Sequence, residues 1–325
     1  MLRVLKYFNI YVQAAIFSFA VAFLDWESIR QVPFRDISNY ISRIDNITNY
    51  GTSYISWENT ISGWLTFEIL WFKILEYASY LNMEPLTFLK YVTLVSAFLT
   101  YLYTRKNFGL LVSVAILLNP ITIDLLSAQV RSGLAFSIFL TAISVGDGKI
   151  KTPAKILLLV LTPFIHSAMT IILAIYASSK FLESTKRIPE KYKQISFFSV
   201  ILLSSVVMAI YVSSALEAIG DRRQLEGIAI KSQAYMVYWY LWAMAFAIPF
   251  LWKKTDWKVY FSTGTLLVGI VMNASGIAGF RFVALSIPVI LSTVPSIRKG
   301  FIPYVIVISI IYDATLFYFW IQPDF

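Results

Sequence analysis

The chain has 325 residues, of which 58% are hydrophobic and only 14% are charged, and its mean hydropathy is +0.70. A soluble domain carries about a quarter charged residues, so these values exclude an ordinary soluble protein. Apolar runs of roughly 20 residues, the length that crosses the hydrocarbon core of a bilayer, recur from end to end. The sequence therefore predicts an all-α polytopic membrane protein that forms a single integral membrane domain over residues 1–325.

The chain contains no cysteine, which excludes disulfides and thiolate chemistry. Its net charge of +9 comes from basic residues in short loops between the apolar runs, where they orient the chain in the membrane. No metal site and no cofactor are expected, because the single histidine has neither cysteines nor a clustered carboxylate motif beside it. No small-residue cleavage site follows the first apolar run, which is therefore interpreted as a retained helix.

Nine apolar segments are predicted to span the membrane, and a further pair of short helices would raise the number to eleven. The nine are Leu5–Leu24, Leu86–Thr104, Phe108–Leu126, Arg131–Val145, Ile195–Ser213, Tyr235–Trp252, Val259–Ala274, Phe282–Val294 and Phe301–Trp320. No internal repeat is evident, so the inverted-repeat plan of many transporters finds no support.

Loop charge predicts the orientation, because basic residues concentrate in cytoplasmic loops. With the N-terminus inside and the C-terminus outside, most of the 27 basic residues lie in cytoplasmic loops. The outer side then holds a first loop over residues 25–60 and a second over residues 214–232. The unusual polar residues of the chain are expected on this outer, non-cytoplasmic face.

The segment Ile61–Leu81 is a poor span, because it carries Glu68, Lys73 and Glu76 among its apolar residues. Its tryptophan and phenylalanine residues favour an amphipathic helix that lies at the outer interface. The sequence therefore predicts one interfacial helix over residues 61–81.

Residues 153–180 have basic loops at both ends, so both ends are expected in the cytoplasm. Pro163 would then break the segment into a re-entrant pair of short helices, with Phe164–Ser167 near the tip. A single kinked span is the alternative, and the sequence leaves both open.

Polar residues interrupt the apolar sequence between Leu118 and Phe136. Asp124, Ser127 and Arg131 are spaced so that an unbroken helix would align them, although Asn119-Pro120 weakens helical continuity just upstream. A charge inside a membrane segment is costly and points to function. An Asp124–Arg131 ion pair, or an arginine that snorkels to the interface, is the structural alternative.

The first outer loop contains Phe34-Arg-Asp-Ile-Ser-Asn-Tyr40, in which Asp36 and Tyr40 would share one face of a helix. This motif lines a polar cleft above the membrane, or it is a solvated helix with local ion pairs. His166 is the only histidine, and an imidazole can take up a proton near neutral pH. It is a catalytic base, or a core histidine whose hydrogen bonds are satisfied.

Further arginines lie in the second half of the chain. Arg222 and Arg223 belong to the second outer loop, where charges are usually solvated. Arg281 follows the small-residue stretch Asn273–Gly279 at the start of an apolar helix. Snorkelling would explain Arg281, but a guanidinium at such a place also suits a phosphate.

Taken together, these motifs resemble the EpsG-like family of exopolysaccharide and O-antigen polymerases, related in role to Wzy-type polymerases. The similar features are Phe34-Arg-Asp-Ile-Ser-Asn-Tyr40, Asn119-Pro120 followed by Gln129-Val-Arg131-Ser-Gly-Leu-Ala, Phe164-Ile-His166-Ser-Ala and Gly279-Phe-Arg281-Phe. Their order and spacing extend over about residues 34–282.

The resemblance implies a GT-C-like, metal-independent glycosyltransferase of the bacterial inner membrane. Such an enzyme transfers oligosaccharide repeats from undecaprenyl pyrophosphate to a hydroxyl of another lipid-linked repeat at the periplasmic face, and a chain-length regulator is a possible partner. Other readings of the sequence are a flippase or transporter of lipid-linked oligosaccharide, a membrane acyltransferase with His166 as its base, and a non-enzymatic scaffold.

The resemblance also implies roles for individual residues. Arg131 and Arg281 would bind the pyrophosphate with support from Arg35, and Arg222 or Arg223 would contribute. His166 or Asp36 would be the general base, and the sequence does not choose between them. Gln129 and Tyr40 would orient sugar or phosphate.

Overall fold

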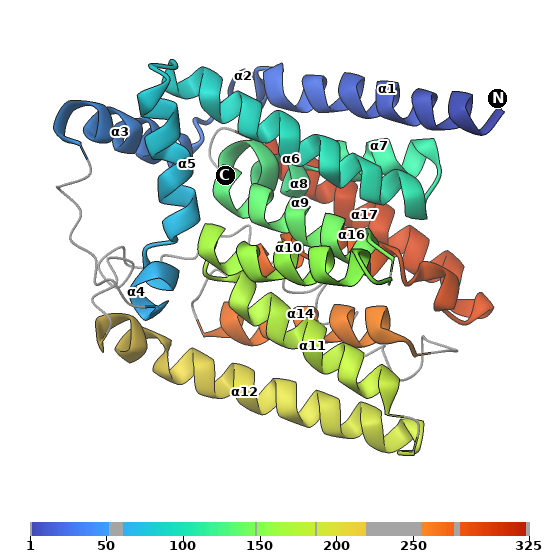
Figure 1. Cartoon of the computed structure of the whole chain (residues 1–325). Coiled ribbons are helices and arrows are strands. Elements are labelled where there is room, and N and C mark those ends of the chain that lie inside the picture. Colours follow the sequence, from blue (N-terminus) through green and yellow to red (C-terminus); the bar gives the residue numbers. More distant parts are fainter. Residues whose placement is uncertain are drawn as a thin grey trace. The chain divides into compact units, whose positions relative to one another are not determined.

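The computed structural model describes residues 2–51, 61–146, 148–185, 187–218, 255–275 and 280–322, and the regular structure in these ranges is entirely helical. The chain divides into two compact units, Met1–Thr170 and Ile171–Phe325. Figure 1 shows the helices in chain order, coloured from blue to red. The predicted all-α class is therefore confirmed.

Unit 1 is built from ten α-helices and one π-helical turn in its described residues. They are α1 (Leu2–Phe23), α2 (Trp26–Arg30), α3 (Arg35–Tyr50), α4 (Ile61–Thr66), α5 (Ile69–Tyr80), α6 (Pro85–Asn107), α7 (Leu110–Leu118), α8 (Pro120–Ile123), the π-helical turn Asp124–Ala128, α9 (Val130–Ser144) and α10 (Lys151–Ile165). Unit 2 contains α11 (Met169–Ser184), α12 (Glu190–Ala218), α14 (Trp257–Ala274), α15 (Phe280–Ala284), α16 (Ile287–Leu291) and α17 (Ile302–Trp320), with single 3₁₀ turns at Val294–Ser296 and Lys299–Phe301.

The core of unit 1 lies where α6 packs between α1 and α9. Alanines on α1 and α6 let the two helices approach closely, and the Tyr101 ring stacks on Phe17. The fully buried residues at this centre are Ala14, Val21, Ala97, Tyr101, Leu117 and Leu126. The same packing also holds the start of α9, because Leu126 belongs to the turn that leads into it.

The predicted span Phe108–Leu126 is not one helix. It breaks at Asn119, where α7 and the following α8 with its π-helical turn are bent by 64°. Asn119 accepts a hydrogen bond from Ile121 N at 2.9 Å through its side chain, and Pro120 starts α8 without needing a donor. The expected weakness at Asn119-Pro120 is therefore confirmed, and the pair is a broken or re-entrant span.

The segment Ile61–Leu81 is not one continuous helix as predicted, and its place at the outer interface stays a prediction. It consists of α4 and α5, which are separated by Phe67 and Glu68. α5 packs against α3, with the Tyr40 and Trp71 rings edge to face at 5.3 Å and the Thr48 and Ser79 hydroxyls 2.8 Å apart. α5 is therefore a packed helix of unit 1, with Trp71 fully buried.

Residues 153–180 are broken, but not at Pro163. α10 continues through Pro163 to Ile165, and α11 starts at Met169. Pro163 lacks the N–H that would bond Leu159 O, and the Thr162 hydroxyl donates to that carbonyl instead at 2.8 Å. The break falls at residues 166–168, next to the predicted tip. A re-entrant arrangement stays a prediction.

In unit 2, α12 packs along α14, with the Phe197 and Tyr260 rings edge to face at 5.2 Å. The span predicted over Phe282–Val294 is not continuous, because α15 ends at Ala284 and α16 starts at Ile287. Pro288 lies in the first turn of α16, where its missing N–H costs no helical hydrogen bond.

Three described helical segments are long and apolar enough to cross a membrane, namely Pro85–Asn107, Glu190–Tyr211 and Lys299–Trp320, and the bent pair Leu110–Ala128 is a possible fourth. Shorter apolar helices occur at Phe8–Phe23, Val130–Ser144, Trp257–Met272 and Ile287–Ser296. The predicted span Tyr235–Trp252 lies outside the described residues. The chain is thus a helical membrane protein, and nine to eleven helices in the membrane remain a prediction.

Candidate functional site

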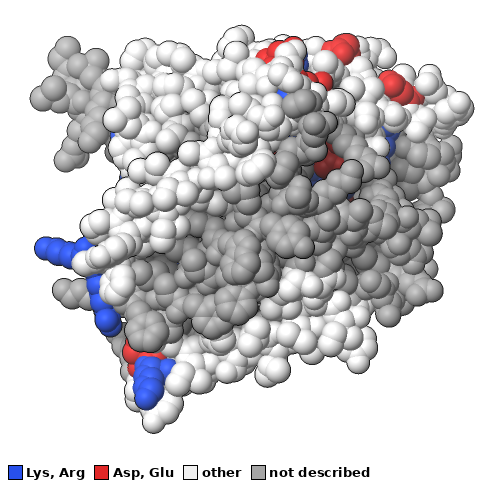
Figure 2. Space-filling view, turned by 180° about the vertical axis from the view of Figure 1, so that it is seen from behind, with Lys and Arg blue, Asp and Glu red and all other residues white. Residues whose placement is uncertain are grey.

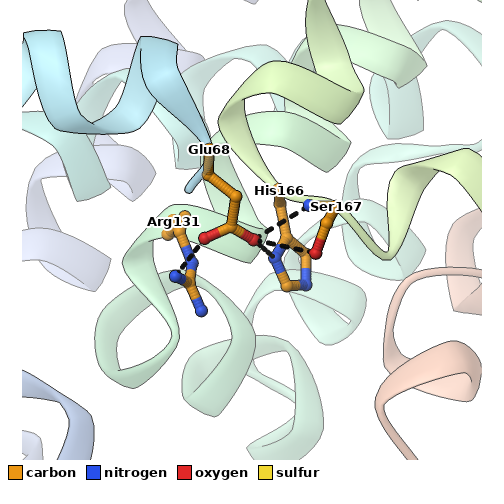
Figure 3. A network of polar contacts seen from close by, with 4 residues as sticks. All are labelled: Glu68, Arg131, His166 and Ser167. Carbon is orange, nitrogen blue, oxygen red and sulfur yellow. Dashed lines mark hydrogen bonds and ion pairs between the residues drawn. The ribbon is translucent and has the colours of Figure 1, made fainter. Parts of the chain in front are cut away.

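A buried carboxylate joins three distant parts of unit 1. Glu68 Oε2 accepts a hydrogen bond and ion pair from Arg131 Nη1. Its other oxygen, Oε1, lies 2.9 Å from His166 Nδ1, 2.9 Å from Ser167 N and 3.1 Å from Ser167 Oγ. Figure 3 shows the four residues, hereafter the Glu68 cluster, with the carboxylate between Arg131 and the His166–Ser167 segment.

The hydrogen bonds fix the protonation pattern of the cluster. An ionised carboxylate only accepts, so His166 donates through Nδ1–H. In the neutral imidazole with this tautomer, the basic lone pair is on Nε2. Ser167 Oγ donates to the same carboxylate oxygen and is therefore not placed as a nucleophile activated by His166.

The cluster is deeply buried, with the side chains of Glu68 6%, His166 5% and Arg131 15% exposed. Burial by itself raises the pKa of the Glu68 carboxyl, but the Arg131 charge and the hydrogen bonds from His166 and Ser167 outweigh it. The pKa of Glu68 is therefore well below its usual range, and Glu68 is an anion at neutral pH.

The backbone of Glu68 adopts an unusual conformation. Its φ of 54° and ψ of 59° are left-handed, a region that non-glycine residues rarely adopt. This conformation ends the α4 turn and starts α5 in a new direction, which directs the carboxylate into the cluster. Such conformations cost about 1–3 kcal/mol and concentrate at functional sites.

Arg131 is positioned by the π-helical turn before α9. The wider turn, closed by Gln129 N donating to Asp124 O at 2.8 Å, interrupts the helix, so Asp124, Ser127 and Arg131 do not share one unbroken helix as expected. Thr93 on α6 donates to Leu126 O at 2.9 Å and holds the turn from the side. Arg131 follows in the first turn of α9.

Gly133 allows this turn to lie directly against α9. A Cβ at Gly133 would be 2.6 Å from Leu125 O and 3.1 Å from Leu126 Cα, both backbone atoms. Any side chain here would therefore push the turn away from α9. The sequence Arg131-Ser-Gly133 thus combines the guanidinium of the cluster with the glycine that lets the π-helical turn lie against α9.

His166 and Ser167 are positioned by the end of α10. His166 N still donates to Thr162 O at 3.0 Å, while the extended backbone of His166 ends the helix. Met169 N then donates to His166 O at 2.9 Å, which closes a tight turn. This turn leaves Ser167 N outside the helical bonding pattern, where it donates to Glu68.

Of the predicted site residues, the fold brings Arg131 and His166 together through Glu68. Tyr40 is buried against Trp71, which lies in α5 three residues after Glu68. Asp36 lies in the first turn of α3, partly exposed, and in the described part of the chain no hydrogen bond links it to the cluster. This geometry favours His166 over Asp36 as the base.

Gln129 caps the start of α9, two residues before Arg131. Its side-chain oxygen is buried and has no hydrogen-bond partner among the described residues. A buried amide oxygen without a donor is costly, so a ligand hydroxyl or amide there would be stabilising.

The structure does not describe the side chains of the other predicted arginines. Arg35 begins α3 and Arg281 lies in α15 of unit 2, and the side chains of both lie outside the described part of the structure. Arg222 and Arg223 lie outside the described residues altogether. Their proposed contacts with pyrophosphate stay predictions.

Glu68 and Ser167 belong to the cluster but are not among the site residues predicted from the sequence. In the sequence, Glu68 counts only as one of the charges that make Ile61–Leu81 a poor span, yet a carboxylate within Phe-Glu-Ile-Leu-Trp is itself a signal, because an acid among apolar residues needs a partner. Ser167 was noted only as the neighbour of His166. Within the described residues, no three histidine or acidic side chains gather to hold a metal ion.

The two ends of unit 1 differ in charge. At one end Arg105 closes α6, and Lys106 donates to Ser144 O at the end of α9. At the other end, Figure 2 shows acidic side chains gathered along the top, over α2 and the start of α6, where Asp25 and Glu84 are exposed. Arg131 is at the opposite end of α9 from Ser144, roughly 20 Å along the helix.

Comparison of the chain with protein-family models, with curated proteins and with solved structures finds no match.

Proposed function

We propose that this protein is a membrane glycosyltransferase, GT-C-like in architecture, that polymerises an O-antigen or exopolysaccharide. Its donor would be an oligosaccharide repeat on undecaprenyl pyrophosphate, and its acceptor a hydroxyl of a second lipid-linked repeat. The observation that carries the proposal is the Glu68 cluster. The arginine of one polymerase-like motif and the histidine of another, 35 positions apart in the sequence, bind the same buried carboxylate.

The proposed reaction needs a base for the acceptor and positive charge for the leaving group. The acceptor oxygen forms a bond with the anomeric carbon, while the bond from that carbon to the pyrophosphate oxygen breaks. Undecaprenyl pyrophosphate leaves with the electron pair, and the acceptor proton passes to His166 Nε2. Glu68 orients the imidazole through Nδ1 and stabilises the imidazolium as it forms.

Arg131 would bind the departing pyrophosphate. A guanidinium has five N–H donors in a planar fork, which matches the oxygens of a phosphate. Fixed donors aimed at developing negative charge lower the barrier most effectively in a buried, low-dielectric site. Arg35 and Arg281, and Arg222 or Arg223, would add charge around the same group. Gln129 and Tyr40 would orient the sugar or the phosphate.

Charge along unit 1 supports an active site on the outer face. Arg105 and Lys106 mark the end expected in the cytoplasm, and Arg131 lies at the other end of α9. We therefore assign the protein to the bacterial inner membrane, with its active site open to the periplasmic side and its apolar helices contacting the polyprenyl tail.

Deletion of the gene in its host, followed by examination of the surface polysaccharide, tests the function. A polymerase deletion leaves single exported repeats, whereas a flippase deletion leaves no exported repeat. A full ladder that has lost only acyl groups would favour an acyltransferase with His166 as its base. Either of the last two outcomes would overturn the proposal.

Complementation with point variants tests the site. Arg131→Ala and His166→Ala are each expected to collapse the polysaccharide ladder while the protein still inserts in the membrane. Arg30→Ala is the matched control, because Arg30 stacks over Phe34 and makes no hydrogen bond or ion pair with the Glu68 cluster in the part of the chain that the structure describes. Normal ladders from both cluster variants would contradict the site assignment.

A further inference from the structure

The Glu68 carboxylate binds its neighbours unequally. Oε1 accepts hydrogen bonds from His166 Nδ1, Ser167 N and Ser167 Oγ, so it is tied to one short segment. Among the described residues, Oε2 accepts its bond from Arg131. The link between Glu68 and α9 therefore depends on one ion pair, while the link to residues 166–167 rests on several bonds.

Arg131 is also the most exposed of the three ionisable side chains in the Glu68 cluster. Its side chain is 15% exposed, against 6% for Glu68 and 5% for His166. It stands in the first turn of a fifteen-residue helix, where backbone N–H groups and the helix dipole also favour an anion. An anion that approaches the cluster would thus meet Arg131 first.

Phosphate is chemically suited to replace a carboxylate on arginine. Both are anions with oxygens that match the planar guanidinium fork, and a phosphate carries more charge. Glu68 occupies on Arg131 the place that a phosphoryl oxygen would take. The resting structure therefore resembles an anion site filled by a side chain of the protein itself.

We propose that a phosphoryl oxygen of the lipid pyrophosphate displaces Glu68 Oε2 from Arg131, while Oε1 stays bonded to His166 and Ser167. The inference rests on the proposed function and adds that Glu68 competes with the substrate for Arg131. Arg131 passes from one anion to another, so its charge is never left unbalanced. Glu68 is then a positioning residue that the substrate frees from its second partner.

The exchange couples donor binding to activation of the base. The charged groups in contact with His166 or its partner, among the described residues, are Glu68 from the α4–α5 junction and Arg131 from α9. While Arg131 binds Glu68, it offsets the negative charge beside the imidazole. After the exchange Glu68 acts on His166 alone, which makes His166 a stronger base. The acceptor is thus deprotonated most readily when the leaving group is in place.

Binding of inorganic pyrophosphate to the full chain in lipid nanodiscs tests the exchange. Glu68→Gln keeps an oxygen for His166 and Ser167 but removes the charge that competes for Arg131. We expect the Kd for pyrophosphate to fall by about tenfold, as for the loss of one opposing charge near the site. Glu76→Gln is the matched control, since Glu76 lies on the same helix α5 and pairs with Lys73 at the surface, 2.6 Å away. Its Kd should stay within about twofold of wild type, because exposed charges interact weakly.

Several results would overturn the exchange. One is a Kd for pyrophosphate that is unchanged or higher in Glu68→Gln. The others are an equal fall of the Kd in Glu76→Gln and full pyrophosphate binding in Arg131→Gln. Should Glu68→Gln fail to fold, Glu68→Ala removes the same competitor and is judged by the same Kd. A purely structural role for Glu68 predicts weaker binding in both Glu68 variants, which is the opposite sign.

The single histidine gives a second measurement, because its ring signals in an NMR spectrum belong to His166 alone. Pyrophosphate should raise the pKa of His166 more in wild type than in Glu68→Gln, since only wild type has the carboxylate that the exchange frees. Equal rises would overturn the coupling to the base.

The two proposals fail separately. If Glu68→Gln does not bind pyrophosphate more tightly while Arg131→Ala and His166→Ala still collapse the ladder, the exchange is wrong and the polymerase function stands. If binding tightens but deletion of the gene leaves a normal ladder, the exchange at Arg131 stands and the polymerase function is wrong.

Discussion

Two carboxylates, Glu68 in unit 1 and Glu190 in unit 2, each collect several donors from other segments. Glu190 accepts from Tyr260 Oη and Thr255 Oγ1, and its other oxygen lies 3.7 Å from Lys193 Nζ. Its side chain is 45% exposed, however, whereas that of Glu68 is 6% exposed. The two residues therefore make similar contacts at very different energetic cost.

The contacts of Glu190 are explained by a structural role. It stands in the first turn of α12, where the helix dipole favours a negative charge, and its bonds to residues near the start of α14 tie two helix ends together. Glu68 is the N-cap residue of α5, but its side chain makes no capping hydrogen bond. It has a left-handed backbone, it is buried, and it holds the only histidine of the chain. A buried ion pair is weak evidence for stability, so function is the better reason for Glu68.

The largest effect that separates the two carboxylates is on turnover. Glu68→Gln removes the charge that orients His166 and stabilises its imidazolium, so we expect polymer formation by isolated membranes to fall by at least about a hundredfold. The turnover of Glu190→Gln should stay within about twofold of wild type, because Glu190 joins the ends of α12 and α14 and is not part of the Glu68 cluster. Incorporation of a labelled lipid-linked repeat measures both. Comparable losses in the two variants would contradict the role of Glu68 in positioning His166.

A smaller effect separates the two tightly packed glycines. A Cβ at Gly133 would be 2.6 Å from backbone oxygen Leu125 O, while a Cβ at Gly264 in unit 2 would be 2.7 Å from Ile175 Cγ2, a side chain. Each substitution to alanine overpacks its unit and should cost about 1–3 kcal/mol of stability. Only Gly133→Ala moves the turn that supports Arg131.

We therefore expect Gly133→Ala to lower turnover by about tenfold, as a small misplacement of a binding group does, and Gly264→Ala to leave the turnover of folded protein near wild type. Thermal unfolding and the labelled-repeat assay measure the two quantities. Gly109→Ala is the control, because nothing lies within 4 Å of a Cβ there. Full turnover in Gly133→Ala would show that Arg131 does not depend on the π-helical turn.

The parts of the site that were predictable are those with a local signal. The break at Asn119-Pro120 follows from an N-cap side chain and a proline at the start of α8. Arg131 and His166 stood out because a charge and a single titratable ring are rare among apolar residues. Each of these inferences needs only the residue and its immediate neighbours.

The rest of the site depends on packing between distant segments. Glu68 meets His166 across 98 positions of sequence, and nothing near Glu68 indicates that partner. The π-helical turn is stabilised by Thr93 on α6, and the sequence of the turn itself does not indicate this contact. The break predicted at Pro163 occurs at residues 166–168, because the Thr162 hydroxyl bonds the carbonyl that proline leaves without a donor. Such replacements are visible only in three dimensions.

The smallest expected effect is on the pH dependence of stability. Burial raises the pKa of Glu68, but Arg131, His166 and Ser167 together hold it well below its ordinary value of about 4.3. A carboxylate whose pKa is lowered by folding contributes stability that is fully present above the ordinary pKa and is lost as pH falls through the folded pKa. The part of the stability difference between wild type and Glu68→Gln that comes from ionisation of the carboxylate should therefore be fully present above about pH 5 and shrink below about pH 4. Thermal unfolding of both proteins in the same lipid measures this difference.

Glu190→Gln is the control. Its stability should differ from that of wild type by less than about 1 kcal/mol at every pH, because solvent screens a half-exposed charge. A wild-type advantage over Glu68→Gln that grew as pH fell below about 4 would have the wrong sign for a carboxylate held ionised by Arg131.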